Sequence, residues 1–213
     1  MSSAQTPERT IGVGPHLQPW PEDHRLDPEL LANGDTRNVI DKYRYWKNEA
    51  IVADLDTTRQ PLHIAIENWQ HDFNIGTIVR NANAFNISVV HIIGKRQWNK
   101  RGAMVTDRYL HVVHHATVDE FSAAMKTAEK TIIAVDNLPG ATPLHDAKLP
   151  RDAVLVFGGE GPGLSDELRG HALATIAIEQ LGSTRSVNVG VASGIVMYAW
   201  LQQHQMTRLV YNH

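Results

Sequence analysis

Residues 154–200 read VLVFGGEGPGLSDELRGHALATIAIEQLGSTRSVNVGVASGIVMYAW and decide the fold. Two short apolar runs, 154–157 and 174–178, are typical of buried strands, and each leads into a loop of glycines and small polar residues. A helix-like run to His204 follows the second loop. Because open α/β sheets hold ligands in loops at the carboxyl ends of their strands, we expect a binding site at these two loops.

The glycines of the first loop do not match the common nucleotide motifs. A P-loop would place a lysine after Gly163, and a dinucleotide fingerprint would place a third glycine where Leu164 or Asp166 stands. A nucleophile elbow around Ser193 is excluded, since Val191 occupies its first glycine position. Two interpretations remain: a backbone that approaches a flat ligand closely, or a tight strand-to-helix turn.

Composition limits the protein class. The chain has 213 residues, 42% of them apolar, which suits one α/β domain with a small appendage. It has no cysteine, and its net charge of -3 argues against a strongly basic nucleic-acid protein but not against a local basic patch. No apolar run reaches membrane-spanning length and the N-terminus lacks a signal-peptide pattern, so we expect a cytoplasmic protein without membrane contact.

Strands and helices alternate from about Pro61 onward. This alternation predicts an α/β fold with a mainly parallel sheet flanked by helices over residues 61–213. Strands are expected at 62–66, 88–93, 111–116, 131–135, 154–157 and 174–178, and helices at 77–85 and 118–130 in addition to the C-terminal one.

Residues 1–60 form a separate part in this prediction. Residues 1–35 contain several prolines and predict an irregular arm, and a helix is expected over 36–50. Basic and aromatic residues interleave in that helix, which suits RNA. We favour the other interpretation, in which the aromatic side chains dock the helix on the main domain.

A basic segment at 95–108 is the best candidate for RNA contact. It carries five cations against one anion and has a tryptophan in its middle. A solvated loop is the alternative interpretation. The candidate RNA-binding residues are Lys95, Arg96, Trp98, Lys100 and Arg101.

A histidine-rich strand at 111–116 could suggest a metal site. His111 and His115 lie on one face of a strand and His114 on the other, and no carboxylate or cysteine completes a ligand set. We therefore expect no metal.

Three blocks of sequence, taken together, resemble a known family. They are NIGTIVRNA at 74–82, FGGEGPGL at 157–164 and SVNVGVASGI at 186–195. In this order they are similar to the three motifs of the SpoU (TrmH-type) RNA 2'-O-ribose methyltransferases of the SPOUT superfamily. The resemblance covers about residues 61–204.

The resemblance implies a fold, a cofactor and partners. It implies a deep C-terminal trefoil knot, an exception to the rule that chains do not thread loops. It also implies S-adenosylmethionine bound in the knot, a homodimer, and methyl transfer to a ribose 2'-hydroxyl of tRNA or rRNA. The competing hypothesis is a non-catalytic RNA-binding protein that keeps the fold; the presence of Arg80 and Asn188 disfavours it.

Site residues follow from the same resemblance. The catalytic positions are Arg80, Asn74, Glu160, Ser186 and Asn188. The cofactor-binding positions are Gly158, Gly159, Gly163, Ile178 and Val187. Ser186 and Asn188 could equally be plain N-cap residues of the following helix, and both roles can coexist. Where the family usually has Pro-Met after the position of Ile178, this chain has Glu179 and Gln180, which suggests a divergent subfamily and leaves the detailed shape of the cofactor pocket open.

Overall fold

The computed structural model describes residues 12–70, 74–159 and 163–206. Two compact units make up the chain, Met1–Leu55 and Asp56–His213. We describe each unit by itself.

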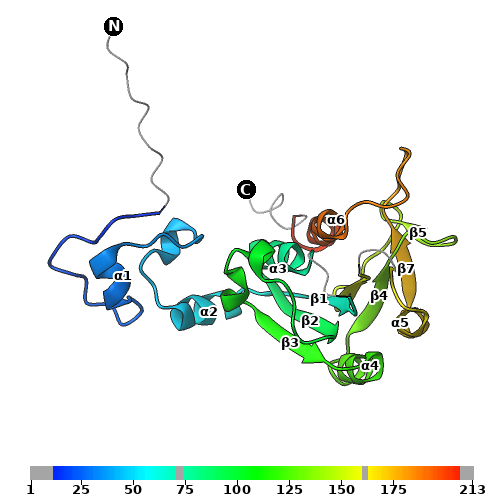
Figure 1. The fold of residues 1–213 in the computed structure, drawn as a ribbon, viewed down its shortest axis with the longest axis horizontal. Coiled ribbons are helices and arrows are strands. Elements are labelled where there is room, and N and C mark those ends of the chain that lie inside the picture. The colour runs from blue at the N-terminus through cyan, green and yellow to red at the C-terminus, as the bar shows by residue number, and fades with distance from the viewer. Residues whose placement is uncertain (1–11, 71–73, 160–162, 207–213) are drawn as a thin grey trace, which may run out of the picture. The chain divides into compact units, whose positions relative to one another are not determined.

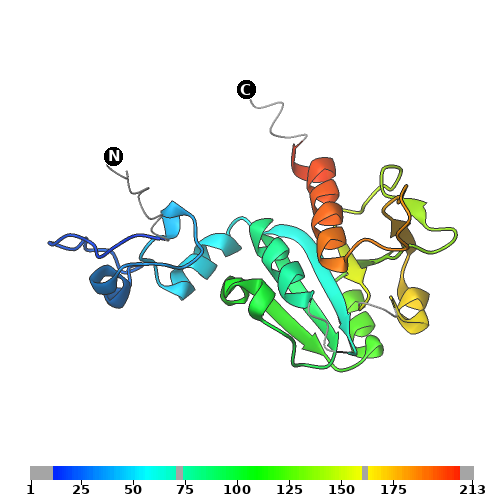
Figure 2. The same cartoon turned by 45° about the horizontal axis from the view of Figure 1, so that its top comes forward.

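The second unit is built on a seven-stranded sheet (Figures 1 and 2). Its strands run in the order β3-β2-β1-β6-β4-β7-β5, and every neighbouring pair is parallel. The bounds are β1 Gln60–Asn68, β2 Ile87–Gly94, β3 His111–His115, β4 Thr131–Val135, β5 Thr142–Pro143, β6 Ala153–Phe157 and β7 Ala174–Ala177. The predicted α/β class and parallel sheet are therefore confirmed; β5 is a two-residue strand that no periodicity indicated.

Four α-helices accompany the sheet in this unit's described residues, with short 3-10 helices at Arg101–Ala103 (η2) and Thr106–Tyr109 (η3). The α-helices are α3 Ile75–Ala84, α4 Val118–Thr127, α5 Asp166–His171 and α6 Val189–Leu201; the turns of Gln202–Met206 (η4) follow α6. Thr117 caps α4 by accepting from the amide of Glu120.

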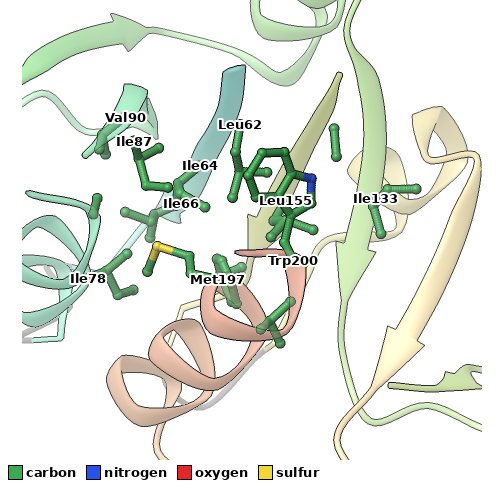
Figure 3. Packing of buried hydrophobic residues seen from close by; sticks show 14 of the residues in the cluster. Leu62, Ile64, Ile66, Ile78, Ile87, Val90, Ile133, Leu155, Met197 and Trp200 are labelled. Carbon is green, nitrogen blue, oxygen red and sulfur yellow. The ribbon is translucent and has the colours of Figure 1, made fainter. Parts of the chain in front are cut away.

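Both faces of the central strand β6 are buried, and its successive residues serve different cores. In β6, Leu155 and Phe157 belong to the core under α3 and α6, whereas Val154 and Val156 belong to the core under α4 and α5. Figure 3 shows Met197 and Trp200 of α6 among the β-strand side chains of the first core. The Trp200 indole is fully buried and donates to the Pro150 carbonyl over 2.8 Å.

The first unit differs from its prediction. Part of the supposed irregular arm is the helix α1, Pro28–Asn33, because Pro28 stands in its first turn, where a missing amide costs nothing, and Asp27 caps it. The prediction of one helix over 36–50 is wrong. This range contains a 3-10 turn, Asp41–Tyr43 (η1), and then the start of α2, Asn48–Asp56.

Buried Asp35 explains why no helix begins there. Its carboxylate is fully buried and accepts from the Arg37 side chain over 2.7 Å and from the amide of Tyr45 over 2.9 Å. These bonds hold the chain in a loop, and Tyr45 adopts a left-handed backbone at φ 63°. The aromatic residues Tyr43 and Trp46 are buried, and their ring contact is with each other, inside the first unit.

Candidate functional site

The carboxyl ends of β4, β6 and β7 open into one cavity of about 290 Å³. Parallel neighbouring strands place these ends at one edge of the sheet, which is where α/β proteins bind ligands. Both loops that the sequence analysis singled out contribute to the lining. The lining residues are Val135, Asp136, Asn137, Leu138, Phe157, Gly158, Gly159, Gly163, Arg169, Ala177, Ile178, Gln180, Ser186, Val187, Asn188, Val189 and Ala192.

The first loop folds back on itself at its glycines. A Cβ on Gly158 would lie 2.1 Å from the carbonyl carbon of Gly163, so no larger residue fits there. Gly163 has φ +71°, and its amide donates to the Gly159 carbonyl over 3.2 Å. Bare backbone therefore forms this wall of the cavity. The predicted catalytic residue Glu160 lies outside the described residues.

The second loop delivers predicted residues to the same cavity. Ser186 and Val187 line it, followed by Asn188 at the start of α6. The Asn188 side chain accepts from the amides of Gly190 and Val191, so Asn188 is the N-cap of α6 and Ser186 is not. The side-chain nitrogen Nδ2 of Asn188 donates to Oδ1 of Asn74 over 2.9 Å. Two predicted catalytic residues from separate motifs thus lie in contact beside the cavity.

Arg80 stands on α3, whose N-cap position is Asn74. Its side chain is exposed and is not among those that line the cavity. The helix itself is fixed against α6: the Asn81 amide donates to the Gly190 carbonyl over 2.9 Å and to Ser193 Oγ over 3.3 Å. Arg80 is therefore an exposed cation on a helix that is packed against α6, which suits it to a charged group of a macromolecule.

Gly190 and Gly194 of α6 lie against α3. A Cβ on Gly190 would lie 2.9 Å from Cγ2 of Thr77, and one on Gly194 would lie 3.2 Å from Nδ2 of Asn81. The two glycines let α6 approach α3 of the same chain.

Several lining residues were missed by sequence reasoning. Asp136 follows β4 directly, and its carboxylate accepts from the amides of Asn137 over 2.8 Å and Leu164 over 3.2 Å. Arg169 reaches the cavity from α5 and pairs with Asp166. The position of Asp136 at the end of a predicted strand was the available signal; nothing in the sequence marked Arg169.

The cavity fits S-adenosylmethionine in its chemistry. Its glycine wall admits a flat ring, and apolar side chains such as Ile178 and Val187 line it. Gln180 contributes a buried Oε1 that has no hydrogen-bond partner among the described residues. An amino or hydroxyl group of the cofactor would satisfy that acceptor. All five predicted cofactor-binding residues line this cavity.

The basic segment lies against the helix that carries Arg80. A Cβ on Gly76 of α3 would lie 2.8 Å from Cα of Gly102, so the two backbones touch. The predicted RNA-binding cations Lys95, Arg96, Lys100 and Arg101 are exposed. Trp98 is half-buried and packs against the first core, with the Lys100 ammonium 5.5 Å from its ring centre.

Three histidines that look scattered in the sequence form a buried chain across β1, β2 and β3. His63 Nδ1 lies 3.0 Å from His91 Nε2, and His91 Nδ1 lies 2.9 Å from His115 Nε2. Burial lowers the pKa of His63 to about 4 and that of His91 to about 3. Within the described part of the chain, no cluster of three histidine, cysteine or acidic residues could hold a metal ion.

No helix in the described ranges is long and apolar enough to cross a membrane.

Comparison with known proteins gives the same picture. The tRNA (guanosine(18)-2'-O)-methyltransferase of Escherichia coli K12 is 26% identical over 160 residues, 73% of this chain and 70% of the relative. The 23S rRNA (guanosine-2'-O-)-methyltransferase RlmB of the same organism is 26% identical over 166 residues, 75% of this chain and 67% of the relative.

Solved structures of similar fold include the A. aeolicus TrmH/SpoU tRNA modifying enzyme, with a TM-score of 0.67 and 21% identity over 76% of this chain and 84% of that one. The Streptomyces viridochromogenes SpoU methyltransferase AviRb, solved in complex with AdoMet, has a TM-score of 0.60 and 22% identity over 70% and 63% of the two chains. The model of the SpoU rRNA Methylase family matches residues 61–198, and the chain belongs to that family.

Proposed function

We propose that this protein transfers the methyl group of S-adenosylmethionine to a ribose 2'-hydroxyl of tRNA or rRNA. The contact between Asn188 and Asn74 beside the glycine-walled cavity carries the proposal, because it joins motifs one and three at a single site. The family and the two RNA-methylating relatives support the same activity.

Arg80 would hold the substrate. A guanidinium stays protonated in proteins, so it is a poor base but a good bidentate partner for a phosphate. Arg80 is exposed on α3, where it can reach the RNA backbone and fix the target ribose. When bound, S-adenosylmethionine supplies an electrophilic methyl group on a sulfonium. Methyl transfer would join the 2'-oxygen to that carbon and break the carbon–sulfur bond, and the hydroxyl proton would pass to phosphate or water.

Asn74, Asn188 and Ser186 would orient the reacting groups. The Asn188 oxygen is committed to the α6 cap and its amide nitrogen to Asn74, so the pair is fixed before substrate arrives. A rigid polar pair at the mouth of a cavity is the kind of group that positions a hydroxyl for attack. Glu160 remains a predicted participant from the family resemblance.

The test is methyl transfer from labelled S-adenosylmethionine into total tRNA and, separately, into rRNA. The wild-type protein should label 2'-O-methyl nucleosides in one pool. Arg80→Ala should lose at least about 100-fold in rate while its affinity for S-adenosylhomocysteine stays unchanged, and Arg80→Lys should recover only part, because lysine lacks the bidentate fork. Cofactor binding without incorporation into either pool would indicate a specialised or precursor RNA substrate, whereas the absence of both incorporation and cofactor binding would favour the non-catalytic RNA-binding alternative.

A homodimer is the second part of the proposal. Val191, Ile195 and Tyr198 are 54%, 40% and 42% exposed and recur at i, i+4 and i+7 on α6, which forms an apolar face beside the site. A second copy of the chain would cover it. Sedimentation should give a dimer for the wild type and a monomer for Ile195→Asp; a wild-type monomer would contradict the proposal.

A C-terminal knot is the third part. Its support is the set of contacts between the end of the chain and the connection before β6: Gln203 Nε2 donates to the Ala147 carbonyl over 2.9 Å, and His204 Nε2 lies 2.8 Å from the Leu149 carbonyl oxygen. A cytoplasmic location remains a prediction that suits a tRNA or rRNA substrate.

A further inference from the structure

Trp69 is an exposed tryptophan that the proposed reaction does not yet use. It follows β1 directly, and 40% of its surface is open to solvent. Tryptophan is usually much more buried than this in a folded domain. An indole left open next to a candidate active site calls for a partner.

The Trp69 ring is held on two sides. Its Nε1 donates to Oε1 of Glu67 over 3.1 Å. Its six-membered ring lies against Gly94, where a Cβ would be only 2.6 Å from Cε3. Glycine at position 94 therefore makes room for the indole, and the ring orientation is set before any ligand binds.

Glu67 ties this ring to the cofactor loop. Its carboxylate is fully buried and accepts from the Ser165 amide over 2.7 Å and from Ser165 Oγ over 2.6 Å. Ser165 comes directly after the Gly163–Leu164 end of the first glycine loop and caps α5. The indole thus shares one anchor with a wall of the cavity.

Asn68, next to Trp69 in the sequence, is hydrogen-bonded to the basic segment. Its side chain donates to the carbonyls of Lys95 over 2.7 Å and Gln97 over 2.9 Å, and its own carbonyl accepts from the Lys95 amide over 2.9 Å. The exposed cations Lys95 and Arg96 directly follow Gly94, which contacts the indole, so the basic segment starts beside the ring. Trp69 stands between the cofactor loop and the cations expected to hold phosphates.

We propose that Trp69 is a stacking platform for an unpaired base of the RNA substrate. The inference rests on the proposed function and identifies a contact of that same site. A fixed aromatic face beside lysine and arginine is the combination that binds single-stranded RNA, with cations on the backbone and the ring on a base. Because the ring is already immobilised, stacking costs little conformational entropy.

The test compares Trp69→Leu with Trp69→Phe, using the RNA pool, tRNA or rRNA, that the wild-type protein methylates. Stacking contributes about 1–3 kcal/mol per base, so Trp69→Leu should weaken RNA binding about 5- to 150-fold. Trp69→Phe loses the bond to Glu67 but keeps an aromatic face, so it should stay within about threefold of the wild type. This control separates stacking from the anchoring hydrogen bond.

Salt dependence separates stacking from charge. Trp69→Leu should leave the slope of log affinity against log salt unchanged, whereas Lys95→Ala should reduce it by about 0.7–0.9 if that lysine contacts a phosphate. S-adenosylhomocysteine affinity and the sedimentation mass should match the wild type in both Trp69 variants.

Three results would overturn the inference: wild-type RNA affinity in Trp69→Leu, equal losses in the leucine and phenylalanine variants, or a changed oligomeric state. The last would assign the indole to a protein interface. A wild-type protein that methylates RNA while Trp69→Leu binds normally would reject this contact alone. A wild-type protein that neither methylates nor binds RNA would reject the proposed function itself.

Discussion

Asn188 Nδ2 donates a hydrogen bond of 2.9 Å to Oδ1 of Asn74, across 114 positions of sequence. The other end of the same amide accepts from the amides of Gly190 over 3.0 Å and Val191 over 3.3 Å and so caps α6. One side chain therefore starts a helix and joins two motifs. The two roles use different atoms, so substitution can separate them.

Asn188→Asp should leave the fold intact and impair the reaction. Aspartate keeps the capping oxygen but cannot donate to Asn74, so thermal stability should stay within about 1 °C while methyl transfer falls sharply. Asn188→Ala removes both functions and should also cost about 1 kcal/mol, or roughly 2–4 °C in melting temperature. Calorimetry with the labelled-methyl assay checks both variants. Full activity in Asn188→Asp would show that the contact with Asn74 is dispensable.

Gln180→Leu should weaken cofactor binding. Among the described residues the Oε1 atom of Gln180 has no hydrogen-bond partner, and Gln180 lines the cavity, so this oxygen is open to a donor group of the cofactor. If the bound cofactor donates to this oxygen, the same variant should bind S-adenosylhomocysteine about 2- to 12-fold more weakly.

The matched control for that experiment is Glu179→Gln, at the exposed neighbouring position, which does not line the cavity. Isothermal titration should give wild-type affinity for it. Unchanged affinity in Gln180→Leu would mean that the cofactor leaves this oxygen unused.

Most of the sheet was predictable from sequence because its central strands are apolar runs between loop residues, and burial of both faces makes that signal strong; the two-residue edge strand β5 carries no such signal. Local hydrogen bonding overrode the pattern elsewhere. The helix expected after Asp35 is absent because the Asp35 carboxylate is buried among Arg37 and the Tyr45 amide, a contact that no periodicity encodes.

The candidate site was predictable only as far as its motifs. The motif glycines and Asn188 could be identified from the sequence, but Asp136 and Arg169 reach the cavity through tertiary packing. The histidine chain was missed for a related reason: His63, His91 and His115 belong to three strands, and only the parallel register brings them together.

Gly190→Ala should destabilise the protein although alanine is the better helix former. A Cβ there would lie 2.9 Å from Cγ2 and 3.1 Å from Cβ of Thr77, a stiff β-branched side chain, so α6 must shift away from α3 at a cost of about 1–3 kcal/mol. Gly170→Ala is the matched control, since a Cβ at this exposed position in α5 meets nothing within 4 Å. That control should be neutral or up to about 1 kcal/mol more stable. Equal melting temperatures for the two variants would contradict the packing argument.

The buried histidine chain should make the protein acid-sensitive between about pH 6.5 and pH 4. Burial, followed by the charges of His63, His115 and Lys130, lowers the pKa of His91 to about 3, and burial, followed by Lys130, lowers that of His63 to about 4. In the unfolded chain both histidines return to a pKa near 6.5.

The unfolded state therefore binds more protons than the folded state as the pH falls below 6.5. The free energy of unfolding must then become smaller as the pH is lowered through that window. Above about pH 6.5 the histidines of this cluster are mostly neutral in both the folded and the unfolded state, so they add little to the dependence of stability on pH. Carboxylates with lowered pKa values, such as that of Asp35 at about 2, act in a separate window below about pH 3.8.

His91→Gln removes the central titrating group but keeps a side-chain amide that can bond to both neighbours. Denaturant unfolding measured at half-unit steps from pH 7.5 to pH 4 should give a shallower fall in stability for this variant than for the wild type. His145→Gln, which changes a histidine that is 65% exposed in the same unit, should keep a slope much closer to that of the wild type. If the wild-type stability stays level from pH 6.5 to pH 4, the three histidines take up protons in the folded protein. The inference that they are buried in their neutral form would then be wrong.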